Sequence, residues 1–274
     1  MSSTSTPHAA PGEPPAIELD RISKSFDGGR TFAVRELSLA VRRSSFVALV
    51  GGSGTGKTTT LKTINRLIEP DSGDVRVNGE PVLSLPAHEL RRRIGYVFQG
   101  LGLFPHLTVG ENIGITPSLL GWQPQQTRAR VEELMDLIGL PREYALRLPA
   151  ALSGGQRQRV AVARALAARS SIMLMDEPFG ALDPVTREAL GAQYRELHER
   201  MGLTTLMVTH DVLEAVLLAD RIVVMRAGEV VADGTPRQLM DYREDEGVRA
   251  LMDMPRRQAQ RVQELLSQGE ATRE

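Results

Sequence analysis

The stretch "GGSGTGKTTT" occupies residues 51–60, directly after the apolar run "FVALV" at 46–50. Glycine adopts backbone angles that other residues avoid, and it lets the backbone approach a ligand closely. Gly51, Gly56, Lys57 and Thr58 match the phosphate-binding pattern G-x-x-x-x-G-K-[ST]. Successive backbone N–H groups of such a loop form a concavity for an anion, and the start of the next helix adds partial positive charge. The stretch predicts a phosphate-binding loop rather than a glycine-rich turn without a ligand.

The flanking sequence supports this prediction. The run at 46–50 is typical of a strand buried on both faces, and residues 57–68 follow it with a helical pattern. A strand, the loop and a helix in this order are the context that the pattern requires. Lys57 would then reach the outer phosphates of a nucleotide, and the Thr58 hydroxyl would ligate Mg²⁺.

Strand and helix patterns alternate along the rest of the chain, which predicts an α/β fold. The fold class expected is a P-loop NTPase core with a mostly parallel sheet, an antiparallel β part near the N-terminus and an inserted helical subdomain at about 100–170. Asn78-Gly79 marks a hairpin turn. Further strands are expected at 16–23, 36–41, 94–99, 171–176, 204–209 and 221–225, and further helices at 131–138, 154–169, 184–200 and 211–218. Residues 1–15 are expected to be a loose tail, 16–236 the main domain and 237–274 a helical extension.

Composition excludes several kinds of protein. The 274 residues include 33 basic and 34 acidic side chains, so the net charge of −1 offers no electrostatic basis for binding nucleic acid. There are no cysteines, which excludes disulfides, thiolate metal sites and cysteine nucleophiles. No apolar run is long enough to span a bilayer, and the start does not have the pattern of a secretory signal. We therefore expect a cytoplasmic protein whose membrane role, if any, goes through partners.

An acidic pair stands at the end of the apolar strand at 171–176. Asp176 and Glu177 stand where a P-loop protein needs a carboxylate for magnesium and a group that activates water. In isolation the pair would be as consistent with a solvated strand end. Together with the P-loop, it predicts Asp176 at the metal and Glu177 at the water.

The sequence "LSGGQ" at 152–156 extends the argument. Together with the P-loop it resembles the signature of the ABC transporter ATPases, and the resemblance covers residues 16 to about 236. "ALD" at 181–183 resembles that family's D-loop. Gln99 is similar to its Q-loop glutamine, and His210 to its switch histidine. Phe26 is similar to the aromatic residue that stacks on adenine, although Phe32 lies nearby and could take that place.

The resemblance implies ATP and Mg²⁺ as cofactors and assigns the site residues. The implied catalytic residues are Glu177, His210 and Gln99. The implied metal ligands are Thr58, Gln99 and Asp176. The implied nucleotide-binding residues are Phe26, Gly51, Gly52, Ser53, Gly54, Thr55, Gly56, Lys57, Thr58, Thr59, Ser153, Gly154, Gly155 and Gln156.

The resemblance also implies partners. In the family two subunits pair head to tail, and each ATP lies between the P-loop of one subunit and the signature of the other. It therefore implies a homodimer at the cytoplasmic face of the membrane, with integral-membrane permease subunits and an extracytoplasmic substrate-binding protein. An ordinary helix cap is the alternative explanation of "LSGGQ" considered without the other motifs.

Some stretches look most like bacterial importers of quaternary amines such as glycine betaine, choline and carnitine. These are "TTTLKTINRLIEPDSG", "QGLGLFPHLTVGENI" and "DEPFGALDPVTR". An importer of amino acids or polyamines, or a non-transport ABC ATPase acting on ribosomes or DNA, remains an alternative. Several members of that group carry C-terminal CBS domains; only the 38 residues 237–274 follow the expected main domain here, so we expect no regulation of that type. Gly52 also replaces a frequent proline.

The loop after Gln99 is rich in apolar residues. Leu101, Leu103, Phe104 and Leu107 could form a docking groove for a permease helix, or they could pack beneath the helical subdomain. The sequence leaves both interpretations open.

Overall fold

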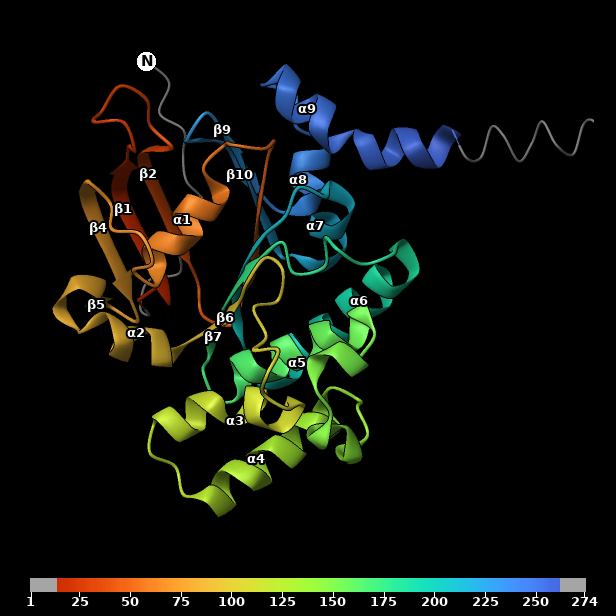
Figure 1. The fold of residues 1–274 in the computed structure, drawn as a ribbon. Coiled ribbons are helices and arrows are strands. Elements are labelled where there is room, and N and C mark those ends of the chain that lie inside the picture. Colours follow the sequence, from red (N-terminus) through yellow and green to blue (C-terminus); the bar gives the residue numbers. More distant parts are fainter. Residues whose placement is uncertain (1–13, 262–274) are drawn as a thin grey trace, which may run out of the picture.

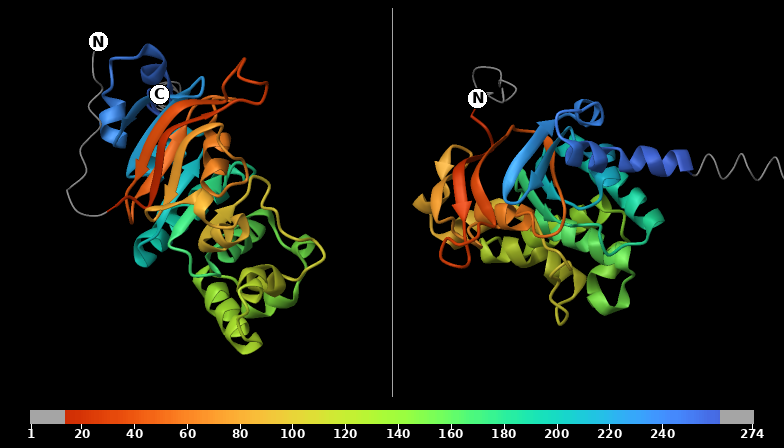
Figure 2. Two further views of the ribbon diagram at one scale, coloured as in Figure 1. Left: turned by 90° about the vertical axis from the view of Figure 1, so that its left-hand side faces the viewer. Right: turned by 90° about the horizontal axis from the view of Figure 1, so that it is seen from above.

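The structure is a computed structural model that describes residues 14–261. Two β-sheets and the helices around them form the upper body in Figure 1, and a group of helices forms the lower lobe. Figure 2 shows the same division from two further sides. The expected fold class, an α/β P-loop core with an antiparallel β part and an inserted helical subdomain, is confirmed.

The larger sheet has six strands in the order β10-β9-β3-β8-β7-β6. All neighbouring strands in it are parallel except β10, which runs antiparallel to β9. Its strands are β3 (Phe46–Val50), β6 (Ile94–Val97), β7 (Ile172–Asp176), β8 (Thr204–Val208), β9 (Arg221–Arg226) and β10 (Glu229–Gly234). Every residue of β3, β7 and β8 is buried, as a parallel sheet covered on both faces requires. β10 is an additional strand that was not predicted from the sequence.

The smaller sheet is antiparallel and has the order β2-β1-β4-β5. Its strands are β1 (Ile17–Lys24), β2 (Val34–Val41), β4 (Ser72–Val77) and β5 (Glu80–Pro81). Asn78 and Gly79 both have positive φ angles, 53° and 83°, which are typical of the two central residues of a type I′ hairpin turn. The hairpin predicted from this dipeptide therefore joins β4 to β5.

The side chains of β3 alternate between two cores. Phe46, Ala48 and Val50 face the core on the side of the lower lobe, whereas Val47 and Leu49 face the core shared with the smaller sheet. α1 (Lys57–Ile64) contributes Leu61 and Ile64 to this second core. The helix is shorter than the predicted 57–68, because Asn65 caps it and Arg66 has a left-handed backbone with φ of 54°. The phosphate-binding loop therefore begins at a strand and ends at a helix that are both anchored by buried side chains.

The lower lobe contains α3 (Val109–Leu119), α4 (Pro124–Leu137) and α5 (Gly154–Leu166). α3 was not predicted from the sequence, because Gly110, Gly114 and Pro117 interrupt its helical pattern. The two glycines permit close packing: a Cβ at Gly110 would lie 3.1 Å from the Ala145 carbonyl oxygen, and one at Gly114 would lie 2.9 Å from Thr127. Close approach to neighbouring segments explains glycines that lower the intrinsic helix propensity.

The remaining helices complete the fold. They are α2 (Ala87–Arg93), α6 (Pro184–Met201), α7 (Val212–Leu218), α8 (Pro236–Met240) and α9 (Glu246–Met252), with 3₁₀ turns η1 (Val82–Ser84), η2 (Arg142–Leu146) and η3 (Pro149–Ala151). Leu239, Val248 and Met252 of α8 and α9 are buried in the same core as the larger sheet. Residues 254–261 are also helical. Residues 1–13 of the tail expected at 1–15, and residues 262–274 at the end of the expected extension, lie outside the described residues.

Among residues 14–261, none of the helices combines the length and the apolar character that crossing a bilayer requires.

Candidate active site

The loop between β3 and α1 depends on the backbone freedom of glycine. Gly51, Gly54 and Gly56 have φ angles of 151°, 74° and 96°. A Cβ at Gly51 would lie 2.3 Å from the Met225 carbonyl oxygen, and one at Gly56 would lie 2.1 Å from that of Ala33. Two of these glycines therefore bring the loop against neighbouring backbone. A Cβ at Gly54 would meet no heavy atom within 4 Å, so this glycine faces open space.

This difference predicts unequal effects of adding one methyl group. Gly54→Ala should cost about 1–2 kcal/mol of unfolding free energy, the strain of a left-handed alanine. Gly56→Ala has the same strain and a backbone clash, which adds about 1–3 kcal/mol. Urea unfolding of both variants measures the difference. Equal destabilisation would show that the contact with Ala33 does not restrain the loop.

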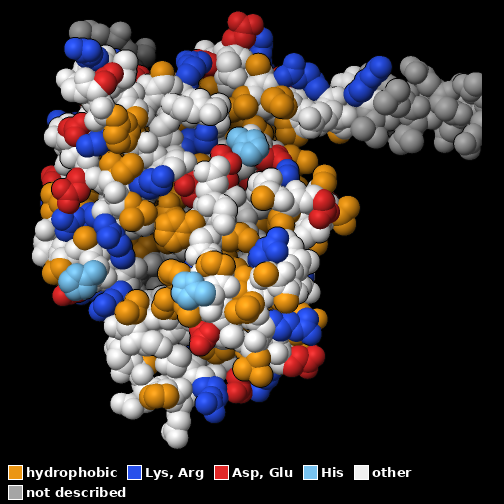
Figure 3. Space-filling view, viewed as in Figure 1, with side chains coloured by type: hydrophobic (Ala, Val, Ile, Leu, Met, Phe, Trp, Pro, Cys, Tyr) orange, Lys and Arg blue, Asp and Glu red, His pale blue; other side chains and the backbone are white. Residues whose placement is uncertain are grey.

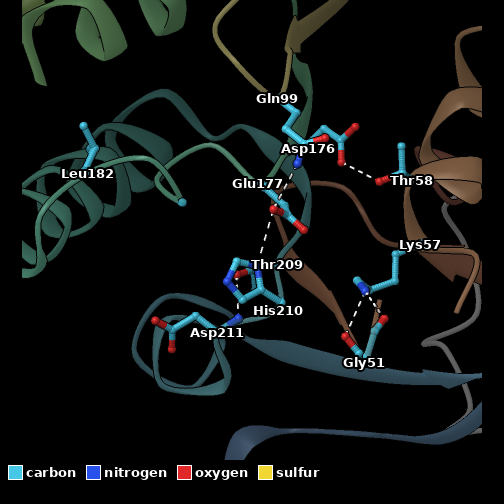
Figure 4. A network of polar contacts seen from close by, with 12 residues as sticks. Gly51, Lys57, Thr58, Gln99, Asp176, Glu177, Leu182, Thr209, His210 and Asp211 are labelled. Carbon is cyan, nitrogen blue, oxygen red and sulfur yellow. Dashed lines mark hydrogen bonds and ion pairs between the residues drawn. The ribbon is translucent and has the colours of Figure 1, made fainter. Parts of the chain in front are cut away.

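Lys57 lies inside the loop, with 6% of its surface exposed. Its Nζ donates to the carbonyl oxygens of Gly51 at 2.8 Å and Gly52 at 2.7 Å (Figure 4). Burial lowers the pKa of Lys57, and the nearby charges of Glu177 and Asp176 partly oppose this shift. The loop thus holds a positive charge at its centre, although burial disfavours that charge.

Thr58 and Asp176 meet at the carboxyl edge of the larger sheet. The Thr58 hydroxyl donates to Asp176 Oδ1 at 2.8 Å (Figure 4). Asp176 is only 3% exposed, and burial raises its pKa while the hydrogen bond from Thr58 lowers it. Thr58 follows the loop after β3 and Asp176 ends β7, so the parallel sheet brings both to one edge. The pair offers hydroxyl and carboxylate oxygens, which are the ligands that Mg²⁺ prefers.

Gln99, Glu177 and His210 converge on one carboxylate oxygen. Gln99 Nε2 donates to Glu177 Oε2 at 3.2 Å, and His210 Nδ1 lies 3.4 Å from the same oxygen (Figure 4). β7 lies between β6 and β8, so the segment after β7 lies between the segments that carry Gln99 and His210. The sequence predicted Gln99 at the end of a strand. β6 ends at Val97, so Gln99 lies just beyond the strand end.

Glu177 has an unusual backbone for a glutamate. Its φ angle is 45°, a left-handed conformation that costs roughly 1–3 kcal/mol in a non-glycine residue and clusters at functional sites. Its N–H donates to the Val208 carbonyl oxygen at 2.9 Å, which continues the pairing of β7 with β8. The side chain is 24% exposed, so it is accessible to water. The strained turn therefore presents a partly solvated carboxylate beside the phosphate-binding loop.

Ser153 begins α5 as its N-cap. Its side chain accepts from the Gln156 N–H, and the Gln156 side chain accepts from the Ser153 N–H. Cβ atoms at Gly154 and Gly155 would lie against Leu182 and Thr186, near the start of α6. α5 belongs to the lower lobe and α1 to the upper body (Figure 1). The site residues thus form two groups within one chain, one around Lys57 and one around Ser153.

Phe26 and Phe32 both lie in the segment between β1 and β2. Phe26 is 66% exposed with Lys24 Nζ 5.7 Å from its ring, and Phe32 is 39% exposed with the Arg35 guanidinium 5.8 Å from its ring. The next residue, Ala33, contacts the loop at Gly56. The segment is therefore adjacent to the phosphate-binding loop. Phe26 as the adenine-stacking residue stays a prediction.

The loop after Gln99 divides into two parts. Leu101 and Leu103 are partly buried against the main core, whereas Phe104 is 41% exposed. Leu101 and Leu103 therefore pack into the core, whereas a docking role for the exposed Phe104 stays a prediction. Arg164 supports the loop from α5 by donating to the carbonyl oxygens of Leu101 and Gly102.

Sequence reasoning did not single out Glu214 of α7, which lies close to His210. Burial raises the pKa of Glu214 to about 7, and a hydrogen bond with Thr209 opposes this shift. An apolar helix that carries one acidic side chain on its buried face is the signal that could have found it. The position of Glu214 after the end of β8 gives no further sequence signal for its role.

This raised pKa predicts a dependence of stability on pH. The folded protein holds the Glu214 proton to a higher pH than the unfolded chain does, so stability is lost as the pH rises from about 4.5 to about 7. Glu214→Gln should therefore stabilise the protein relative to wild type by on the order of 2 kcal/mol above neutral pH, and much less in acid. Urea unfolding at several pH values measures this, with the exposed Glu188→Gln as control. A benefit that does not change with pH would contradict the prediction.

The sequence of this chain is similar to sequences of known proteins. The profile of the ABC transporter family matches residues 34–180. The chain is 51% identical over 224 residues to the glycine betaine uptake system ATP-binding protein YehX of Escherichia coli (strain K12), covering 82% of this chain and 72% of that protein. It is 47% identical over 232 residues to the choline transport ATP-binding protein OpuBA of Bacillus subtilis (strain 168), covering 85% of this chain. The chain spans 61% of the length of OpuBA.

Solved structures show the same architecture. The dimeric structure of MJ0796, a bacterial ABC transporter cassette, has a TM-score of 0.72 and 34% sequence identity, covering 80% of this chain and 98% of that one. A dimeric post-hydrolysis state of the ATP-binding cassette MJ0796, bound to ADP and Pi, gives the same values. The family profile, the relatives and the shared fold together establish that this chain belongs to the ABC transporter family.

Proposed function

We propose that this chain is the ATP-hydrolysing subunit of an ABC importer and that residues 16–236 form its ATPase domain. The observation that carries the proposal is the meeting of Glu177 with Gln99 and His210 beside the loop that holds Lys57. The family and the descriptions of the relatives point to the same activity. Each residue role below is part of the proposal.

The loop after β3 fits a nucleotide phosphate. α1 begins at Lys57 without a side-chain cap, so its first N–H groups can donate to an anion. Lys57 would exchange its two carbonyl partners for phosphate oxygens. The residues that would surround the phosphates are Gly51, Gly52, Ser53, Gly54, Thr55, Gly56, Lys57, Thr58 and Thr59, and Phe26 would stack on the base.

Thr58, Asp176 and Gln99 would hold Mg²⁺. The hydroxyl and carboxylate of Thr58 and Asp176 already lie within hydrogen-bond distance of each other. When bound, Mg²⁺ neutralises negative charge that develops on the transferred phosphoryl group. Gln99 would have to turn from Glu177 to serve as a ligand.

Glu177 would accept a proton from the attacking water, because its carboxylate is partly exposed and lies beside the loop. Gln99 and His210 both contact Oε2, which restricts the orientation of the carboxylate. His210 would also donate to the outermost phosphate. Positioning of this kind supplies most of the catalysis in phosphoryl transfer.

The two groups of site residues would be joined by dimerisation. Ser153, Gly154, Gly155 and Gln156 form an N-terminal helix end that can accept an anion, but it belongs to a different lobe from Lys57. A head-to-tail homodimer would place Ser153 of one subunit against the nucleotide held by Lys57 of the other. The related MJ0796 cassette is described as dimeric, which supports this arrangement.

The descriptions of the relatives support a proposal for the transported substrate. YehX is described as part of a glycine betaine uptake system and OpuBA as a choline transport protein, so quaternary-amine osmoprotectants are the proposed cargo. Permease subunits and an extracytoplasmic binding protein would complete the importer, with this chain at the cytoplasmic face of the membrane. Phe104 is exposed on the loop after Gln99 and would contact the permease. On the side of the molecule seen in Figure 1, Figure 3 shows apolar side chains spread between charged ones across the middle.

Uptake by intact cells tests the proposal. Loss of the gene should abolish uptake of labelled glycine betaine or choline and leave uptake of amino acids and spermidine unchanged. The wild-type chain should restore uptake, whereas the Glu177→Gln variant should not. A loss confined to amino acids or polyamines would support the alternative cargo, and co-purification with ribosomes or DNA instead of a permease would overturn the proposal.

A further inference from the structure

Arg187 connects two loops of the site, the loop after Glu177 and the loop that carries His210. It lies in α6, and its Nη1 donates to Asp211 Oδ2 at 3.0 Å. Its Nη2 donates to the carbonyl oxygen of Leu182 at 3.0 Å and lies 3.4 Å from that of Gly180. One guanidinium group thus contacts the segment after Glu177 and the segment after His210.

The start of α6 explains why the side chain lies there. Asp183 is the N-cap of the helix, and its carbonyl oxygen accepts from the Arg187 N–H at 2.9 Å. Long side chains in a helix lean toward its N-terminus, which directs Arg187 back to the loop that precedes α6. An arginine in the first turns of a helix is thus the sequence signal for this contact.

The first loop is tied to Glu177. The Gly180 N–H lies 3.3 Å from the Glu177 carbonyl oxygen, and the Leu182 N–H donates to the Phe179 carbonyl oxygen at 3.1 Å. Arg187 therefore bonds carbonyl oxygens of the turn at 180–182, while the Gly180 N–H of the same turn bonds the Glu177 carbonyl oxygen. Movement of 180–183 and movement of Glu177 cannot be independent while these bonds persist.

The second loop carries His210. Asp211 Oδ1 accepts from the Glu214 N–H at 3.2 Å and caps α7, while its Oδ2 accepts from Arg187. The Asp211 N–H also donates to the Thr209 hydroxyl at 3.0 Å. The residues on both sides of His210 are therefore bonded to each other, and Arg187 fastens that pair to α6. Figure 4 shows Asp211 and Thr209 beside His210, with Leu182 on the neighbouring segment.

Arg187 and Asp211 form a partly buried ion pair. The side chains of Arg187 and Asp211 are 28% and 31% exposed, so each ion is only partly solvated. Arg187 Nε is buried without a hydrogen-bond partner, which means that the guanidinium has given up water on that side. Arg187 and His210 both lower the pKa of Glu214, and Asp211 raises it, so the four groups interact. Removing Arg187 would leave Asp211 without its cation.

We propose that Arg187 is a positioning residue that fastens the loop at 180–183 to the loop at 209–211, and thereby holds His210 against Glu177. The inference rests on the proposed function, because the reaction that it assists is the hydrolysis assigned to Glu177. Arg187 acts through His210 and Asp211 and contacts no phosphate itself.

Arg187→Met in the full chain tests this role, and Arg195→Met is a matched control. Arg195 lies in the same helix with a side chain 27% exposed, and it also bonds an aspartate, Asp220, and a carbonyl oxygen, that of Leu218. Unlike Arg187, it pairs with a glutamate as well, Glu199. Arg187→Met should lower kcat for ATP about tenfold or more, with KM within about threefold, because it disturbs positioning and not binding. Arg195→Met should change kcat less than about twofold. Equal kinetic effects of the two variants would overturn the proposal.

A double variant shows whether Arg187 acts through His210. In a His210→Ala background, Arg187→Met should lower kcat by no more than about twofold, because residues that act as one unit are not additive. A further loss as large as in the wild-type background would contradict the proposal. If Arg187→Met does not fold, Arg187→Lys carries the same comparison, because lysine lacks the planar fork that lets Nη1 bond Asp211 while Nη2 bonds Leu182.

Amide hydrogen exchange of the nucleotide-free protein tests whether Arg187 joins the two loops, and it does not depend on ATPase activity. Arg187→Met should raise exchange at residues 180–183 and 209–211 together by about tenfold, and Arg195→Met should not. Unchanged exchange at either loop would overturn the proposal. A wild-type chain that hydrolyses no ATP would instead contradict the proposed function, while exchange would still decide whether Arg187 joins the loops.

Discussion

Glu177→Gln is expected to lower ATP turnover at least about a hundredfold, while nucleotide binding changes by less than about twofold. The amide has nearly the shape of the carboxylate, so the contacts to Gln99 and His210 can persist. It cannot accept the proton of the attacking water, and this proton transfer is the step that the substitution removes. The nucleotide would be held by the loop around Lys57, which Glu177 does not bond.

Two measurements on the full chain separate these effects. Steady-state phosphate release gives turnover, and equilibrium binding of a fluorescent ATP analogue gives affinity. Glu188→Gln, on the exposed side of α6, removes the same charge and should leave both unchanged. Turnover of Glu177→Gln near the wild-type rate would show that another group activates the water.

Lys57→Met is expected to weaken ATP binding roughly 10- to 100-fold, because a charge-assisted hydrogen bond contributes about 1.5–3 kcal/mol. Methionine has a similar length and keeps the loop filled, so the lost contribution is that of the ammonium group. Binding is the quantity to measure, since turnover would fall for either a binding or a chemical defect.

Lys62, the other lysine of α1, provides the control for this variant. Lys62→Met removes the same charge from the same helix and should weaken binding less than about threefold, because Lys62 is only partly buried and lies outside the loop, although its charge acts on Asp176. Unchanged ATP affinity of Lys57→Met would remove the phosphate-binding assignment. A loss of folding would show itself in the thermal unfolding curve and calls for Lys57→Arg, which keeps the charge but changes its shape.

Much of the fold could be predicted because its signals are local. The run at 46–50 forms β3 with every residue buried, and the Asn78-Gly79 turn joins two strands. The loop after β3 has positive φ angles at Gly51, Gly54 and Gly56, a conformation that glycine adopts without the strain of other residues. Conversely, α3 was missed because its glycines serve packing against distant residues, which short-range patterns do not record.

The candidate site shows the same division between local and long-range information. The residue types of the site were predictable one by one, since each follows a strand or begins a helix. Their meeting was not, because it depends on the order of β6, β7 and β8 in the sheet. A role for Arg187 was not predicted from the sequence. Its contacts to Leu182 and Asp211 require the start of α6 to lie next to the segment after β8, and this depends on the tertiary structure.

The sequence by itself determines the strand, loop and helix around Lys57, because hydrophobic periodicity and the backbone freedom of glycine are local properties of the chain. Only the folded arrangement brings Gln99 and His210 to the same oxygen of Glu177 and sets Ser153 in another lobe from Lys57. The physical reason is that strand pairing in a parallel sheet joins segments far apart in the chain. Their side chains meet at one edge only after the whole core has packed.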